Sequence, residues 1–341
     1  MLRLILLFIG LLTFIALMWH VGLGRIVHVA AGLGPIALIV ILLPSAFMHA
    51  LETLGWRLTL GRYARTVSFG RLLAIRTAGE VVNMTTPTAY VGGEPLKAYL
   101  LKKHGVPLVD GLASVVTAKT TMTIAQMLFI TMGIASSVWS MQSGRSHAFG
   151  QVSILAVAIG VGVMLFGTVT LIAAQRQGLF TSLLALLRRC RIRLHVLESR
   201  EEKLQALDRT IIDFYSRARH AFLLSTGACL LGWLTEALEV YAILLYIGPP
   251  PDFFSSISIG ALAVLIKGGT FFIPGSVGAQ EGGNLVLLMA YGYSDVEGLT
   301  FAILRRVREL MWIGIGLLCM AAMGGRDETE NLNVGANSSA Q

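Results

Sequence analysis

Six stretches of the sequence are apolar enough and long enough to cross a lipid bilayer, and this feature excludes most soluble folds. Each approaches the roughly 20 apolar residues that a helix needs to span the hydrocarbon core. Only 13% of the residues are charged and the mean hydropathy is +0.72, whereas a soluble domain would carry roughly twice that charged fraction. The sequence therefore predicts an all-α polytopic membrane protein with full spans at about 4–19, 35–54, 108–135, 152–174, 221–247 and 297–324.

Basic residues gather in blocks beside these spans, and their distribution predicts the orientation of the chain. The net charge is +8, but Lys and Arg flank apolar segments as topology determinants do, so we expect no nucleic-acid partner. The blocks at 57–76, 97–103 and 176–219 belong in the cytosol, whereas the loops near 145 and 250 lie outside. Both termini are then cytosolic.

The segment between Arg76 and Lys97 has basic residues at both ends, so it is not expected to cross the membrane. It contains the polar stretch NMTTPTAYVGGE. Non-helical polar backbone at membrane depth is tolerated where protein or a water-filled cavity surrounds it. We therefore predict a re-entrant hairpin with Asn83, Thr85, Thr86 and Pro87 at its tip; a plain cytosolic loop is the alternative.

An internal repeat relates the two halves of the chain. A shift of 187 positions without gaps superposes their unusual polar features, placing Glu52 on Glu239, Pro87 on Pro274, Glu94 on Glu281 and Lys119 on Arg306. Because the predicted topology runs the halves in opposite directions, they form an inverted repeat at about 35–135 and 221–324. Inverted repeats are typical of transporters, in which interrupted helices meet near the bilayer midplane.

The repeat predicts a second re-entrant hairpin, which enters from outside and has its tip in FFIPGSVGAQEGG at 271–283. A single transmembrane domain, 1–325, then comprises both repeats and the segment 176–219 between them. That segment combines helical apolar spacing with a basic face, which predicts an amphipathic connector on the inner leaflet. The polar tail 326–341 is predicted to be disordered.

The last span carries charged residues inside the membrane. A cation near the bilayer centre costs roughly 2.5–3.5 kcal/mol, so it should face the bundle interior, a partner or a ligand. Arginine makes bidentate contacts with phosphate, so we predict a site for an anionic lipid headgroup. The candidate substrate-binding residues are Glu52, Asn83, Thr86, Glu94, Lys119, Glu239, Glu281, Arg305, Arg306, Arg308 and Glu309.

A structural role for these charges is the alternative, in which the cations pair with the intramembrane glutamates and hold the helices together. The two roles overlap, because a glutamate can hold a cation until a substrate phosphate displaces it. Glu80 and Lys267, also related by the 187-residue shift, are a weaker candidate for a further bridge.

Motifs of familiar enzymes are missing from the sequence. It contains no phosphate-binding P-loop, HExxH pair, GxSxG elbow or Cys/His cluster. The three scattered cysteines predict neither a metal site nor a disulfide. We expect a protein that is not an enzyme and that uses no cofactor or metal.

Two segments carry a resemblance to a known family. TPTAYVGGEPLKAYLL and IPGSVGAQEGG resemble hairpin segments of the flippase-like family built on the membrane domain of lysylphosphatidylglycerol synthase, which includes small stand-alone members, some associated with hopanoid lipid synthesis. The resemblance covers about 1–325 and implies a membrane protein that moves a lipid, or a lipid-linked polar group, between leaflets. It points to Gly92, Gly93, Glu94, Pro274, Gly275, Gly278, Glu281 and Gly282.

Three positions depart from the usual pattern of that family. Ser276 stands where glycine is common, Gln280 where arginine is frequent, and Lys119 where an arginine is expected. The chain has no soluble aminoacyl-transferase domain, so we do not expect it to synthesise a lysyl lipid.

These features together predict a lipid flippase or scramblase-like translocator in the bacterial cytoplasmic (inner) membrane. Opposed hairpins give both leaflets a polar entrance, which a one-sided active site would not need. The alternative is a non-transporting accessory subunit or a membrane-embedded transferase of lipid or envelope biosynthesis. The expected partners are membrane lipids with an anionic phosphate headgroup; lipid-biosynthesis enzymes and a second copy of the chain are further candidates.

Overall fold

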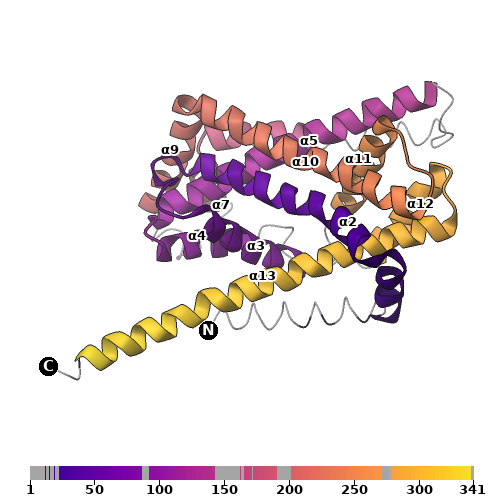
Figure 1. The fold of residues 1–341 in the computed structure, drawn as a ribbon. Coiled ribbons are helices and arrows are strands. Elements are labelled where there is room, and N and C mark those ends of the chain that lie inside the picture. Colours follow the sequence, from indigo (N-terminus) through magenta and orange to yellow (C-terminus); the bar gives the residue numbers. More distant parts are fainter. Residues whose placement is uncertain are drawn as a thin grey trace.

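The computed structural model describes residues 23–86, 92–142, 165–170, 172–189, 201–270 and 278–338, with isolated residues at 12, 15, 19, 162 and 276. Regular structure in these ranges is helical throughout. The elements are α2 (Leu23–Thr59), the 3₁₀ helix η1 (Gly61–Tyr63), α3 (Phe69–Thr85), α4 (Gly93–Lys103), α5 (Leu108–Gln142), α7 (Leu179–Arg189), α9 (Glu201–Arg217), α10 (Arg219–Ile247), α11 (Phe253–Gly269), α12 (Ala279–Ala290) and α13 (Asp295–Ser338). Figure 1 shows an elongated bundle along which the long helices run.

Three described helices are long and apolar enough to cross a membrane. They are Gly32–Thr59 within α2, Leu108–Ser137 within α5 and Arg219–Ile247, which is α10, and they match the predicted spans 35–54, 108–135 and 221–247. The first contains a break in α2 near its start, where Gly34 has a φ of 78° that glycine adopts far more readily than other residues.

The other three predicted spans have a different outcome. α13 contains the predicted span 297–324, but four charged side chains interrupt its apolar sequence. Most of the predicted spans 4–19 and 152–174 lies outside the described residues.

The order of helices repeats along the chain. α2, α3, α4 and α5 are followed in the second half by α10, α11, α12 and α13, each set being long, short, short and long. Two of the four pairs start at close to the shift found in the sequence, 187 for α5 and α13 (295 − 108) and 186 for α4 and α12 (279 − 93), whereas α3 and α11 differ by 184 and α2 and α10 by 196. In Figure 1, α10 runs opposite to α2, and α13 runs opposite to α5. The arrangement of the two halves across a bilayer stays a prediction.

The first hairpin consists of α3 and α4, whose backbones touch. A Cβ atom on Gly93 would lie 2.0 Å from the carbonyl oxygen of Gly79. The Gly93 amide donates a hydrogen bond to Oδ1 of Asn83 at 2.7 Å, which ties the start of α4 to the end of α3. On its other side, α3 meets α13 where a Cβ on Gly316 would lie 2.8 Å from the carbonyl oxygen of Thr77. Glycine therefore allows α3 to fit between α4 and α13.

The second hairpin consists of α11 and α12, which pack against each other and lie towards the opposite end of the bundle from α3 and α4 (Figure 1). Residues 87–91 of the first tip, and 271–275 and 277 of the second, lie outside the described residues. The predicted tip residues Pro87, Pro274 and Gly275 are among them.

Helices α7 and α9 form the connector between the halves, and α9 packs on the bundle. Asp208 of α9 accepts a hydrogen bond from the amide of Thr181 in α7 at 2.8 Å. The buried face of α9, which includes Ile211 and Tyr215, packs against Ala113 of α5. The predicted amphipathic helices are present, but the apolar face of α9 covers α5 instead of entering the lipid.

Helix α13 continues to Ser338 and so runs through most of the polar tail 326–341, and the disorder of this tail stays a prediction. Extending an existing helix adds a backbone hydrogen bond for each residue without a new nucleation cost. Polar composition alone does not reveal that this segment follows directly on a long helix.

We expect Gly93→Ala to destabilise the protein by about 1–3 kcal/mol, because the added methyl group forces the backbones of α3 and α4 apart. Gly70→Ala is the control in the same hairpin, since nothing lies within 4 Å of its added Cβ. This variant should be neutral or stabilise by about 0.5–1 kcal/mol, as alanine replaces glycine in a helix. Thermal melting in detergent measures both; equal melting temperatures would show that the hairpin does not close at Gly93.

Candidate functional site

Four polar side chains join the two arms of the first hairpin below its tip. Nζ of Lys97 lies 2.6 Å from Oε1 of Glu80 and 3.1 Å from Oε2 of Glu94. Asn83 donates from Nδ2 to Glu94 at 3.2 Å and to Glu80 at 3.3 Å. Because α3 supplies Glu80 and Asn83 while α4 supplies Glu94 and Lys97, the Lys97–Glu80 and Asn83–Glu94 contacts cross between the helices. The other two contacts lie within one helix. Two predicted site residues, Asn83 and Glu94, are thus brought together.

Lys119 of α5 is the more accessible of the two lysines that contact Glu94. Its side chain is 34% exposed, compared with 7% for Lys97. Its Nζ lies 3.7 Å from Oε1 of Glu94, a longer contact than either ion pair of Lys97. Lys119 is therefore the cation here that a ligand could reach and pair with at the smallest cost.

A separate ion pair joins α2 to α3. Arg76 donates to the carboxylate of Glu52, and its Nη1 lies 2.7 Å from Nδ1 of His49. The ring of His49 packs on Trp312 of α13, with 3.9 Å between ring centroids. Arg76 and Lys97, which the sequence assigns to cytosolic basic blocks, are buried in the bundle and bound to carboxylates; the side of the membrane on which they lie stays a prediction.

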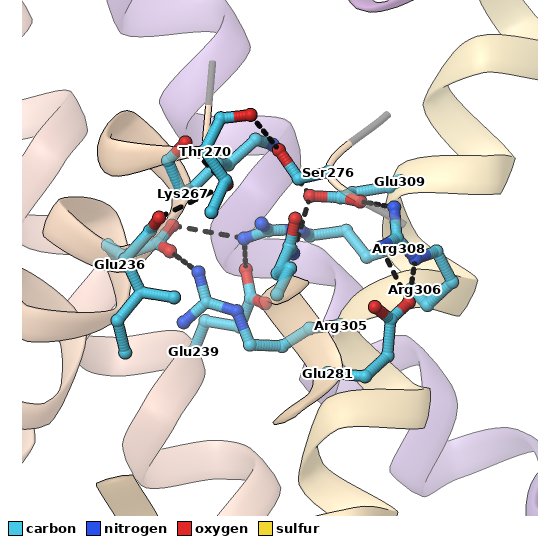
Figure 2. Close-up of polar contacts among 12 residues, drawn as sticks. Glu236, Glu239, Lys267, Thr270, Ser276, Glu281, Arg305, Arg306, Arg308 and Glu309 are labelled. Carbon is cyan, nitrogen blue, oxygen red and sulfur yellow. Dashed lines mark hydrogen bonds and ion pairs between the residues drawn. The ribbon is translucent and has the colours of Figure 1, made fainter. Parts of the chain in front are cut away.

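Arg306 of α13 is the centre of the corresponding cluster at the second hairpin (Figure 2). Its Nη2 lies 2.5 Å from Oε1 of Glu281 on α12, and its Nη1 lies 2.7 Å from Oε2 of Glu309. Glu309 also pairs with Lys267 of α11 at 2.6 Å and accepts a hydrogen bond from Nε2 of Gln280 at 2.9 Å. These contacts join α11, α12 and α13.

Arg305 and Arg308 of α13 pair with α10 (Figure 2). Arg305 donates to Glu236, while Arg308 donates to Glu236 at 3.0 Å and also to Glu239. All four side chains are buried. The predicted site residues Glu239, Arg305 and Arg308 therefore meet, and Glu236 completes the group.

The same ion pair recurs in both halves at the shift found in the sequence. Lys119 and Glu94 fall on Arg306 and Glu281 (119 + 187 = 306 and 94 + 187 = 281), and each pair links the first turn of a hairpin's second helix to the next long helix. The copies differ in access, because Lys119 is 34% exposed and Arg306 is 2% exposed. The cation at this repeated position is partly exposed in the first half and buried in the second.

The predicted bridge between Glu80 and Lys267 is wrong. Each side chain pairs within its own half, Glu80 with Lys97 and Lys267 with Glu309. The sequence shift relates equivalent positions in the two halves, and equivalent positions need not touch.

The remaining predicted residues shape the backbone of the hairpins. Thr86 donates from Oγ1 to the carbonyl of Val82 at 2.6 Å. Gly92 is the N-cap of α4. Gly278 precedes α12 with a φ of 78°, and its amide donates to Oε2 of Glu281 at 2.8 Å. Gly282 lies in the first turn of α12, where an added Cβ would meet nothing within 4 Å.

Five side chains of this network are not among the candidate site residues of the sequence analysis, namely His49, Arg76, Lys97, Glu236 and Gln280. Glu236 had a readable signal, because it precedes Glu239 by three residues and therefore faces the same side of a helix. For Arg76 and Lys97 the positive-inside pattern indicates an exposed cytosolic position. Glu52 and Glu80, which hold them, are 24 and 17 residues away in the sequence, whereas Glu94, three residues before Lys97, was a readable signal.

Within the described residues the network contains seven carboxylates and seven lysine or arginine cations. It is therefore neutral. An unpaired charge in such an interior carries an effective penalty of several kcal/mol, so a cation can take up a new anion most readily when its carboxylate partner is released at the same time. The described residues hold no group of three or more His, Cys, Asp or Glu side chains suited to a metal ion.

A small cavity lies among the charges of the first half. Its volume is about 30 Å³, and its lining includes Glu52, Arg76, Glu94, Lys119 and Cys229. This space suits one or two water molecules. A lipid headgroup needs more room, so the helices around Lys119 must separate before one can enter.

A bundle with apolar spans and a neutral network of buried ion pairs defines an integral membrane protein with a polar interior. Residues 2–316 match the family model of the lysylphosphatidylglycerol synthase TM region. The chain belongs to this family, as the hairpin resemblance predicts.

The similar proteins are archaeal membrane proteins. The chain is 23% identical over 329 residues to a UPF0104 membrane protein of Methanothermobacter thermautotrophicus, covering 94% of this chain and 93% of the relative. Another match to a UPF0104 membrane protein of that organism has 28% identity over 268 residues, or 76% of each chain. A UPF0104 membrane protein of Methanocaldococcus jannaschii is 28% identical over 130 residues, or 38% of each chain. No solved structure matches significantly.

We expect Arg76→Leu to destabilise the protein by about 3–5 kcal/mol, because it leaves the buried carboxylate of Glu52 without its cation. The double variant Glu52→Gln/Arg76→Leu should recover most of this loss. Arg62→Gln is the control, since Arg62 is 77% exposed and 3.8 Å from Asp110, and exposed pairs contribute about 0–1 kcal/mol. The melting temperatures of the three variants test the pairing of Glu52 with Arg76. A double variant no more stable than Arg76→Leu would refute it.

Proposed function

We propose that the protein moves lipids with an anionic phosphate headgroup between the two leaflets of the cytoplasmic membrane. The observation that carries the proposal is the contrast between two equivalent cations. Lys119 is 34% exposed beside a cavity, whereas Arg306 is 2% exposed and holds two carboxylates. One copy of the repeated position is accessible to a ligand while the other is closed by protein.

We propose that the more accessible cation, Lys119, binds a lipid phosphate by an exchange of ion-pair partners. In the closed form, Glu94 neutralises Lys119 and also contacts Lys97 at 3.1 Å. When a lipid phosphate approaches, it replaces Glu94 at Lys119, and Glu94 keeps Lys97 and Asn83 as partners. Every charged group keeps a contact during this exchange, but Glu80 and Glu94 then share Lys97, and the bound phosphate adds one net negative charge to this half. The contact with Lys119 therefore reduces the desolvation cost of the headgroup without abolishing it.

The opposite directions of the two halves support passage through the membrane. A hairpin that enters from each side gives each leaflet its own polar entrance, as in transporters built from inverted repeats. The family is named for the membrane region of an enzyme whose name specifies a phospholipid, and this association also favours a lipid substrate.

A non-transporting accessory subunit or a membrane-embedded transferase is the alternative function. The exposed Lys119 would then hold a lipid for a partner enzyme at one leaflet. Translocation by the purified protein distinguishes the two functions. Liposomes that carry anionic, zwitterionic or polyprenyl-phosphate fluorescent lipids should show transfer between leaflets that requires the protein; an inert result with all three would favour the accessory role.

Lys119→Met tests the proposed site. Each charge-assisted hydrogen bond contributes about 1.5–3 kcal/mol, so transfer of an anionic fluorescent lipid should slow about tenfold or more while the melting temperature changes little. Arg306→Gln should instead lower the melting temperature, because it removes the cation paired with Glu281 and leaves Glu309 with Lys267 as its cation. Lys102→Met, which removes an exposed cation of α4 outside the network, should leave both measurements unchanged.

If Lys119 has a structural role, the expected effect on the melting temperature is the opposite. Lys119→Met would then lower the melting temperature, and Glu94→Gln in the same chain would restore stability and transport together. That result would overturn the ligand assignment.

The inverted topology has its own test. We expect single cysteines at Lys102, after the first hairpin, and at Asp295, after the second, to react with a membrane-impermeant maleimide from opposite sides of the membrane in a protein otherwise free of cysteine. Both positions are exposed. Lys102 should be cytosolic because basic residues are retained there. Labelling of both positions from one side would refute the inverted arrangement.

A further inference from the structure

A second and larger pocket lies away from the charge network, where the connector meets α10. Its volume is about 470 Å³, and its lining includes Arg176, Tyr215, Arg219, Phe222 and Leu223. This size falls within the roughly 300–1,000 Å³ of typical small-molecule sites. The pocket is therefore large enough for a headgroup, unlike the cavity beside Lys119.

The described lining of this pocket is positively charged. Arg176 and Arg219 are both exposed, and no Asp or Glu is among the described lining residues. The guanidinium of Arg176 lies 5.8 Å from the ring centroid of Tyr215. Two arginines near one cavity, with no carboxylate to neutralise them there, favour a doubly coordinated anion such as phosphate.

The aromatic wall of the pocket is anchored to the transmembrane bundle. Tyr215 donates from its hydroxyl to Oε1 of Gln175 at 2.6 Å, and the same oxygen accepts a hydrogen bond from Thr120 of α5 at 3.1 Å. Burial raises the pKa of Tyr215, so its phenol stays neutral and does not repel an anion. The pocket thus has a fixed wall as well as charge.

An apolar surface begins at the rim of the pocket and continues along α10. Leu223, Leu231, Leu238 and Leu245 are 66%, 57%, 54% and 47% exposed. Their spacings of eight, seven and seven residues keep them on one face of a helix. This face runs from the arginines along a span that is apolar enough to cross the membrane, and it suits an acyl chain.

We infer that the connector pocket binds the phosphate group of an amphiphile, with Arg176 and Arg219 as the phosphate ligands and the acyl chain along the exposed leucines of α10. None of these residues belongs to the buried charge network. The inference therefore does not rest on translocation, and binding alone tests it.

Native mass spectrometry of the full-length protein, titrated with phosphatidylglycerol or phosphatidylcholine in detergent, measures this binding. Loss of one charge-assisted contact weakens an interaction about tenfold, so Arg176→Gln/Arg219→Gln should weaken phosphatidylglycerol binding at least ~10-fold. Ser216→Trp, which fills the pocket without changing its charge, should have a similar effect. The matched control is Arg209→Gln/Arg217→Gln, which removes two exposed arginines of α9 that do not line the pocket and should leave binding unchanged.

Two further comparisons separate this site from others. Binding at the pocket should persist in Lys119→Met, and loss of all phosphatidylglycerol binding in that variant would assign the lipid to the central network instead. Inorganic phosphate at equal concentration should displace little phosphatidylglycerol, because it lacks the apolar contacts. Equal affinities would show a site for free phosphate and overturn the lipid assignment, and equal weakening by the α9 control would reduce the effect to non-specific charge.

Discussion

The penalty for an unpaired charge in a protein interior dictates how this bundle is assembled. Each half is neutral by itself: Glu52, Glu80 and Glu94 balance three cations, and Glu236, Glu239, Glu281 and Glu309 balance four. Most of these pairs join different helices, so the charges can pair only when the helices pack together. If one helix moved away from its neighbour, an ion pair would break and leave buried charges unpaired. The closed arrangement is therefore stable, and opening at a cation depends on another anion that replaces its carboxylate partner.

The two halves meet this requirement in different ways. Arg306 lies against two carboxylates and is almost completely buried, whereas Lys119 has a single, longer contact and partial exposure. A lysine is also a compact charge on a flexible stem, which suits a partner that is exchanged, while the arginine fork suits two fixed partners. The second hairpin is thus the rigid half, and the first hairpin is the half where a ligand can enter. Tight backbone contact at Gly93 limits how the first hairpin can open, so movement of α5 away from α4 is the simplest route.

Much of the fold could be predicted from the sequence, because apolar length and the 187-residue repeat are local or periodic signals. These signals gave the spans of α2, α5 and α10 and the positions of both hairpins. The site was harder to predict, because pairing depends on which helix lies opposite. In the sequence Arg76 resembles a topology determinant, and only the structure shows that it pairs with Glu52. Glu80 and Lys267 resemble partners in the sequence, but the structure pairs Glu80 with Lys97 and Lys267 with Glu309. The connector pocket also needed the structure, since it combines Arg176 with residues of α9 and α10.

The lipids that co-purify with the protein test the central claim, namely that Lys119 is a ligand for a lipid phosphate. The protein should carry Arg176→Gln and Arg219→Gln, so that the connector pocket does not contribute. Mass spectrometry should then show phosphate-headgroup lipids enriched over the surrounding membrane. This enrichment should disappear with Lys119→Met and persist with Lys102→Met. The same lipid profile as the bulk membrane, with or without Lys119, would contradict the account.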